Sequence, residues 1–254
     1  SETARQGTLP PATRDTVSAL WPDAIGSFLA VENTSKGEAL LLRRDTAEIP
    51  TNISVVGYAA ASTRVTLQDV RAVPCASRAL LRVQGAPAGW SLALDTQHAR
   101  PVQIDALEDL SPADSQRVVV RIQRALNALP DVGAAQEFHG LPVVVRDAWL
   151  VRLPTGPAVV TRAARLRNLG ATAHEELRFV VLEDDQPRYV ARVAGDEEAV
   201  ESWDLPAALL TDHGLLLVVA REGPRSLQIE LVASEDSTWR SIWRSDRLTC
   251  PTAR

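Results

Sequence analysis

EELRFVVLE at residues 175–183 and RYVARVA at residues 188–194 are separated by Asp184-Asp185-Gln186-Pro187. Both segments are rich in Val, Leu, Phe or Tyr, and the residues between them are of the kinds that form turns. Two such segments joined by a short turn predict a β-hairpin, in which the two strands pair antiparallel. The same pattern recurs along the chain and predicts a mainly β protein.

The other hairpins and strands share this composition of short apolar runs bounded by Gly, Pro, Ser or Thr. No alternation of strand, helix and strand is present, which argues against a parallel doubly wound sheet. We therefore expect an antiparallel sandwich or an open barrel. The predicted hairpins are 27–32 with 38–44, 143–153 with 158–168, and 214–222 with 226–233, and the further strands are 53–60, 64–70, 78–85, 90–95 and 238–245.

One amphipathic helix is predicted at about residues 112–129. Ser111 is suited to the N-cap and Pro112 to the first helical position, and Pro130 ends the run. Apolar side chains recur at helical spacing, which predicts a helix that covers a sheet. They are Val118, Ile122, Ala125, Leu126 and Leu129.

Residues 1–16 lack apolar periodicity and contain Pro10-Pro11, which predicts a flexible N-terminal arm. Residues 17–254 are then expected to form one β-rich body. The alternative is a pair of β subdomains at 17–110 and 140–254, joined by the helix. A disulfide between the first region and the C-terminal segment would favour the single body.

The composition of the 254 residues points to export and argues against nucleic-acid binding and a transmembrane segment. The formal net charge of −5 argues against nucleic-acid binding, and no apolar run is long enough for a transmembrane segment. The chain has no Met and begins at Ser1, which is the pattern left by removal of a signal peptide. Cys75 and Cys250 are expected to form a disulfide, so a periplasmic or extracellular location is predicted. Lys36 is the single lysine, and this preference for Arg is typical of a GC-rich bacterial genome.

The predicted hairpin at 175–194 carries acidic residues at the ends of both strands, opposite its turn. One imidazole among several carboxylates is a donor set for a divalent metal ion, and crowded carboxylates suit acid–base chemistry. A metal-dependent hydrolase is therefore one alternative function, although an acidic rim exposed to solvent explains the same residues. The candidate ligands are His174, Glu175, Glu176, Asp196 and Glu198.

Two further groups of residues are candidates for binding. Trp239 and Trp243 would share one face of a strand, and exposed indoles stack on sugar rings, so a carbohydrate-binding module is another alternative. Arginines line one face of the predicted helix and also cluster in the hairpin at 143–168, where they could meet an anionic surface or an acidic partner. The helix arginines are Arg117, Arg121 and Arg124, and the hairpin arginines are Arg146, Arg152, Arg162, Arg165 and Arg167.

The sequence favours a non-enzymatic protein that acts by binding a protein partner outside the cytoplasm. It contains none of the motifs that mark nucleotide-binding loops, zinc proteases or serine hydrolases, and it implies no cofactor. An accessory subunit of a periplasmic or surface assembly is the expected role.

Overall fold

The computed structural model describes residues 28–33, 38–43, 52–56, 62–72, 78–87, 92–94, 99–170, 172–197, 200–211, 214–223, 226–235 and 238–244. Over these residues the protein is mainly β, with antiparallel sheets built from hairpins and one α-helix, and none of the sheets is a closed barrel. The predicted fold class is confirmed. The proposed arm at 1–16 and both cysteines lie outside the described residues.

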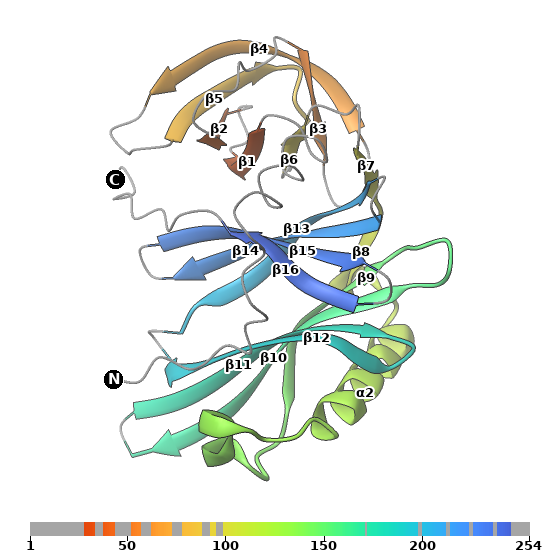
Figure 1. Cartoon of the computed structure of the whole chain (residues 1–254), viewed down its shortest axis with the longest axis vertical. Coiled ribbons are helices and arrows are strands. Elements are labelled where there is room, and N and C mark those ends of the chain that lie inside the picture. Colours follow the sequence, from red (N-terminus) through yellow and green to blue (C-terminus); the bar gives the residue numbers. More distant parts are fainter. Residues whose placement is uncertain are drawn as a thin grey trace.

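The first sheet is six-stranded and strongly curled (Figure 1). Its outermost strands, β1 and β6, contact each other without forming a ladder, so the sheet bends round on itself. The strand order is β1-β2-β5-β4-β3-β6, with β1 at Phe28–Asn33, β2 at Glu38–Arg43, β3 at Asn52–Val56, β4 at Ser62–Ala72, β5 at Arg78–Gln84 and β6 at Leu92–Leu94.

Two five-stranded sheets pack face to face below the first one (Figure 1). The central sheet has the order β16-β15-β14-β13-β7, and the outer sheet has the order β12-β11-β10-β9-β8. The central strands are β7 (Ala99–Val102), β13 (Ser202–Thr211), β14 (Gly214–Gly223), β15 (Ser226–Glu235) and β16 (Thr238–Arg244). The outer strands are β8 (Ile104–Ala106), β9 (Val144–Val151), β10 (Ala158–Leu169), β11 (Thr172–Glu183) and β12 (Gln186–Asp196).

The β11–β12 hairpin turns more tightly than the sequence predicts. Gln186 pairs with Glu183, so the turn contains only Asp184 and Asp185. Both have positive φ angles, 51° and 61°, which suit the twist of a two-residue hairpin turn. Asp is one of the few residues other than Gly that accept this conformation.

The central and outer sheets share one stretch of chain. β7 ends at Val102 in the central sheet, and β8 begins at Ile104 in the outer sheet. Only Gln103 separates them, and its carbonyl oxygen accepts a hydrogen bond of 2.9 Å from the backbone N–H of Arg152. The sandwich is therefore joined along this edge by a strand that changes sheets.

Each layer of the protein is held by its own apolar cluster. The largest lies between the central and outer sheets and includes Phe179 of β11 and Trp203 of β13. A second covers the opposite face of the central sheet, where Val56 of β3 joins it to the first sheet. The third packs the helix against the outer sheet. The layers therefore follow one another as first sheet, central sheet, outer sheet and helix.

Helix α2 spans Pro112–Asn127, two residues fewer than predicted. The Ser111 hydroxyl accepts a hydrogen bond of 3.2 Å from the backbone N–H of Asp114, as expected of an N-cap. The buried side chains are Val118, Ile122, Ala125 and Leu126, all of which the helical spacing predicts. Among the described residues, no helix has the length and hydrophobicity needed to cross a membrane.

Candidate functional site

The outward face of α2 carries a row of arginines around an exposed valine. Arg117 lies three and four residues before Val120 and Arg121, and Arg124 lies four and three residues after them, so all four share one side of the helix. The side chains of Arg117 and Arg121 are 75% and 50% exposed, and Val120 is 42% exposed. We call these four residues the α2 surface.

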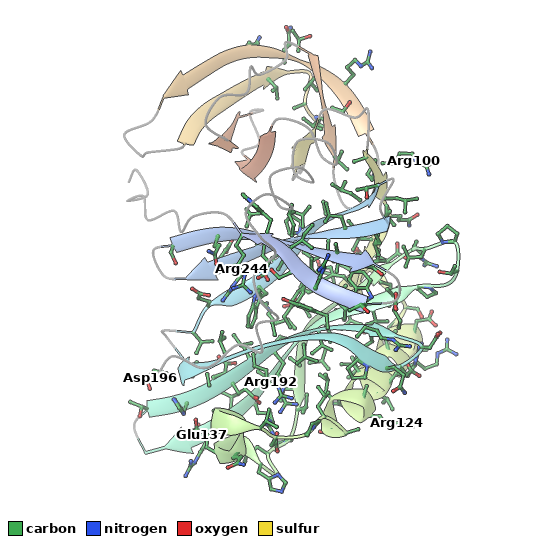
Figure 2. The ribbon with its side chains drawn as sticks, viewed as in Figure 1. Arg100, Arg124, Glu137, Arg192, Asp196 and Arg244 are labelled. Carbon is green, nitrogen blue, oxygen red and sulfur yellow. The ribbon has the colours of Figure 1, made fainter. Side chains whose placement is uncertain are left out.

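Exposed acidic groups pair with two of the three arginines of the α2 surface. Arg117 pairs with Asp114 on the same helix, and Arg121 Nη2 lies 2.7 Å from Asp185 Oδ1 in the β11–β12 turn. Arg124 has no ion pair with any described residue. Ion pairs this exposed contribute little free energy, about 0–1 kcal/mol, so the arginines remain available to a partner. Figure 2 shows Arg124 on α2 at the outer side of the molecule.

The arginines of the β9–β10 hairpin each have a carboxylate partner, and Arg165 is buried with its partners, whereas Arg146, Arg152 and Arg167 are partly exposed. The sequence groups them with the helix arginines as a basic patch, but the structure pairs them across strands and loops. Such pairs brace the sheet and leave little net charge for a ligand. They are Arg146 with Glu175, Arg152 with Asp105, Arg162 with Asp147, Arg165 with Glu176 and Asp131, and Arg167 with Glu137.

A closed ring of two carboxylates and two guanidinium groups lies beneath the C-terminal end of α2. Arg165 contacts Glu176 Oε2 at 2.7 Å and Asp131 Oδ1 at 2.7 Å. Arg178 contacts the same two oxygens at 3.0 and 3.1 Å. Glu176, Arg178 and Arg165 are 1%, 2% and 4% exposed. We call these residues the buried ring.

The buried ring also fixes α2 on the outer sheet. Arg178 Nη1 donates to the carbonyl oxygen of Leu126, in the last turn of the helix, where carbonyls lack partners within the helix. The hydrogen bond from Arg165 is the main reason why the pKa of Asp131 falls from 3.8 to about 2. Asp131 is therefore ionised at neutral pH, and the contacts of the ring hold the C-terminal end of α2 on the outer sheet.

The predicted metal ligands are only partly brought together. His174 lies opposite Asp196 in the β11–β12 ladder, as the hairpin geometry predicts. Its Nδ1 lies 3.3 Å from Glu137 Oε2, and its ring stacks on Phe138 with the centroids 5.7 Å apart. Figure 2 shows Glu137 on the short helix after α2.

The predicted acidic ligands of the same hairpin point to different partners. Glu175 and Glu176 are neighbours on β11, so their side chains lie on opposite faces, where arginines hold both. Glu198 lies outside the described residues. Among those that are described, no group of three or more His, Cys, Asp or Glu side chains is placed to hold a metal ion.

Trp239 and Trp243 lie on different sides of the central sheet, contrary to the sequence expectation. A β-bulge in β16 leaves Ile242 without a partner in the ladder, so the alternation of faces is reversed between the two indoles. Trp239 is 2% exposed and packs between the central and outer sheets. Trp243 is partly buried against the other cluster. The predicted row of exposed indoles is not formed.

Charged residues between the central and outer sheets form a network that sequence reasoning missed. Glu230 of β15 lies 3.5 Å from Arg221 and 2.9 Å from Arg244, and it accepts a hydrogen bond from Tyr189. Burial raises the pKa of Tyr189 well above its usual range, and the carboxylate of Glu230 adds to this effect. The available signal was a charged residue inside an apolar strand, as in LQIELVA at 227–233.

No family model matches the chain, and no curated protein or solved structure is similar enough to match it.

Proposed function

We propose that the protein is a non-enzymatic binding protein, and that the α2 surface docks onto an acidic segment of a partner protein. The observation that carries the proposal is the contrast between the two groups of arginines. Arg165 of the β9–β10 hairpin is buried between two carboxylates, whereas Arg117, Arg121 and Arg124 surround exposed Val120 on an outward face, where Arg117 and Arg121 have only exposed carboxylate partners. An apolar centre with a charged rim is the usual organisation of a protein interface.

The charge distribution favours an acidic partner over other occupants. The chain has a formal net charge of −5, so as a whole it repels an acidic protein. The α2 surface is a local exception, which would orient an approaching acidic segment and speed its association. Arg is also enriched among the residues that dominate binding energy at interfaces.

We propose further that this binding takes place outside the cytoplasm, in an accessory subunit of a periplasmic or surface assembly. The support is the expected Cys75–Cys250 disulfide, which the sequence predicts and which lies outside the described residues. Peptide mapping of the native protein without reduction should recover one cross-linked peptide containing both cysteines. Recovery of both as free thiols would remove this support.

The binding proposal is tested with a photo-crosslinking residue at Val120 in the full chain, exposed to periplasm and solubilised membranes of the source cells. We expect one covalent product at Val120 and none at Thr155, in the exposed loop between β9 and β10. The double variant Arg117→Glu/Arg124→Glu should abolish it by reversing the charge of the surface. Arg121 is kept because it also contacts Asp185, so replacing it would alter the β11–β12 turn as well as the surface.

The matched control carries the same change in net charge far from α2. Arg64 on β4 and Arg100 on β7 are both exposed. Figure 2 shows Arg100 well separated from Arg124. The control variant Arg64→Glu/Arg100→Glu should retain the crosslinked product. Equal loss in both double variants, or no product from the wild-type chain, would contradict the proposal.

A further inference from the structure

Arg178 and Arg192 lie directly opposite each other on β11 and β12. Like charges at opposed positions of an antiparallel ladder repel each other, so such a pair needs negative charge nearby. Arg178 has it, because both carboxylates of the buried ring contact its guanidinium group. The ring is already neutral without Arg192, since its two carboxylates balance Arg165 and Arg178.

Arg192 has one hydrogen bond and no carboxylate partner among the residues that the structure describes. Its Nη2 donates to the carbonyl oxygen of Pro130 at 3.1 Å. Its Nε and Nη1 are shielded from solvent and have no acceptor. Burial lowers the pKa of Arg192 and repulsion by Arg178 lowers it further, but a guanidinium group remains charged in a protein. Glu176 and Asp131 act on this charge only from a distance, so a guanidinium group without a direct carboxylate contact is left beside the C-terminal end of α2.

Glu176 has an oxygen atom without a hydrogen-bond donor, which complements the donors of Arg192 that lack an acceptor. Its Oε2 accepts from Arg165 and Arg178, whereas its Oε1 is shielded from solvent and has no donor. Glu176 pairs with Ala194 and Arg192 with Arg178, so Glu176 and Arg192 are diagonal neighbours on the helix-facing side of the outer sheet. Unused donors and an unused acceptor thus lie in the same part of the cluster.

We propose that Arg192 is the anchor of a binding site for a small oxyanion of the phosphate class. The negative charge compensates the guanidinium group, and the oxygens accept from its unused N–H donors. Hydrogen phosphate also carries a hydroxyl group, which can donate to Glu176 Oε1, whereas acetate ion has no such donor. Arg192 is partly exposed, but its Nε and Nη1 are shielded, so the anion reaches them when the side chain moves outward.

Calorimetric titration with inorganic phosphate tests the site in the full chain, in chloride buffer of constant ionic strength. We expect saturable 1:1 binding by the wild-type protein and a matching rise in Tm, with weaker binding of acetate. Arg192→Met keeps the aliphatic stem and removes the charge, so this variant should lose phosphate binding. The matched control is Arg188→Met, which removes an exposed arginine from the same strand and should bind phosphate as the wild type does.

A second measurement uses the proteins without phosphate. If Arg192 lacks a counter-ion when no phosphate is bound, the Tm of Arg192→Met in chloride buffer should equal or exceed that of the wild type. The reason is that the variant removes a charge without a direct carboxylate contact. A clear drop in its Tm would show that the protein already satisfies Arg192 and would overturn the proposal. The absence of saturable phosphate binding to the wild type, binding that survives Arg192→Met, or preference for acetate would overturn it as well.

Discussion

Arg221 lies over the ring of Trp203, with its guanidinium carbon 5.6 Å from the ring centroid, between the central and outer sheets. The two residues are also direct neighbours in the β13–β14 ladder. The same guanidinium contacts Glu201 at 2.9 Å and Glu230 at 3.5 Å. One planar side chain therefore stacks on an indole and pairs with two carboxylates.

Arg221→Lys should destabilise the fold although it conserves the charge. An ammonium group cannot stack as a plane or reach both carboxylates, so we expect a loss of about 2 kcal/mol in the free energy of unfolding. Urea denaturation measures it. Arg64→Lys, at an exposed position, is the control and should change the free energy little. Equal effects of the two substitutions would contradict the importance of this contact.

Glu176→Gln should be among the most damaging single substitutions in the buried ring. It removes the charge that Arg165 and Arg178 share, and it leaves two buried guanidinium groups with Asp131 alone. Removing one partner of a buried ion pair costs about 3–5 kcal/mol. Thermal and urea unfolding should show the loss, while Glu222→Gln at an exposed position of β14 should unfold like the wild type.

Asp131 predicts how stability depends on pH. The hydrogen bond from Arg165 lowers its pKa from 3.8 to about 2. A lowered carboxyl pKa stabilises the folded state above pH 3.8, and the contribution is lost as the pH falls toward 2. The difference in unfolding free energy between wild type and Asp131→Asn should therefore be full at pH 7 and shrink between pH 4 and pH 2. A difference that is constant with pH would contradict this assignment.

Ser111→Ala should weaken the start of α2 without changing the rest of the fold. The hydroxyl accepts from the backbone N–H of Asp114 at 3.2 Å and donates to its carboxylate at 2.6 Å. Loss of an N-cap costs about 1 kcal/mol. Denaturation measures the change, and Ser111→Asp should restore most of it because Asp also caps helices. If Ser111→Ala unfolds like the wild type, the cap has no measurable role.

The metal alternative is open to a direct measurement. Arg165 and Arg178 hold Glu176, and Arg146 holds Glu175, so we expect no stoichiometric divalent metal in the purified protein and no change of Tm with EDTA. Elemental analysis and thermal unfolding check these outcomes. One metal ion per chain, together with a Tm lowered by the chelator, would favour the hydrolase alternative and would place Glu198 among the ligands to be tested.

The sequence predicts the local part of this fold well. Turn residues between apolar runs locate the β9–β10, β11–β12 and β14–β15 hairpins, because adjacent strands pair through short connections. The cap at Ser111 and the helical spacing locate α2 for the same reason. One exception is β13, where Asp204 and Pro206 interrupt the apolar pattern. The structure accommodates them with a bulge between Asp204 and Ala207.

What the sequence does not predict depends on contacts between distant residues. The reversal of Trp239 and Trp243 requires one unpaired residue in β16, and no residue type marks that position. The burial of Arg165 depends on Asp131, which lies 34 positions away in the chain and belongs to no strand. Hence the arginines of the hairpin and those of α2 look alike in sequence, and only the fold tells the buried ones from the exposed ones.

Gln103 makes the sandwich a hinged structure. One residue spans at most about 3.3–3.6 Å, whereas packed sheets lie about 10 Å apart, so the layers must converge where β7 passes into β8. Separation of the layers at this edge would break the ladder to β13 or the ladder to β9. Any separation of the central and outer sheets should therefore occur at the opposite edge, at β12 and β16. Arg192 is on β12 at that edge but faces α2, away from the interior of the sandwich, so access to Arg192 does not depend on this opening.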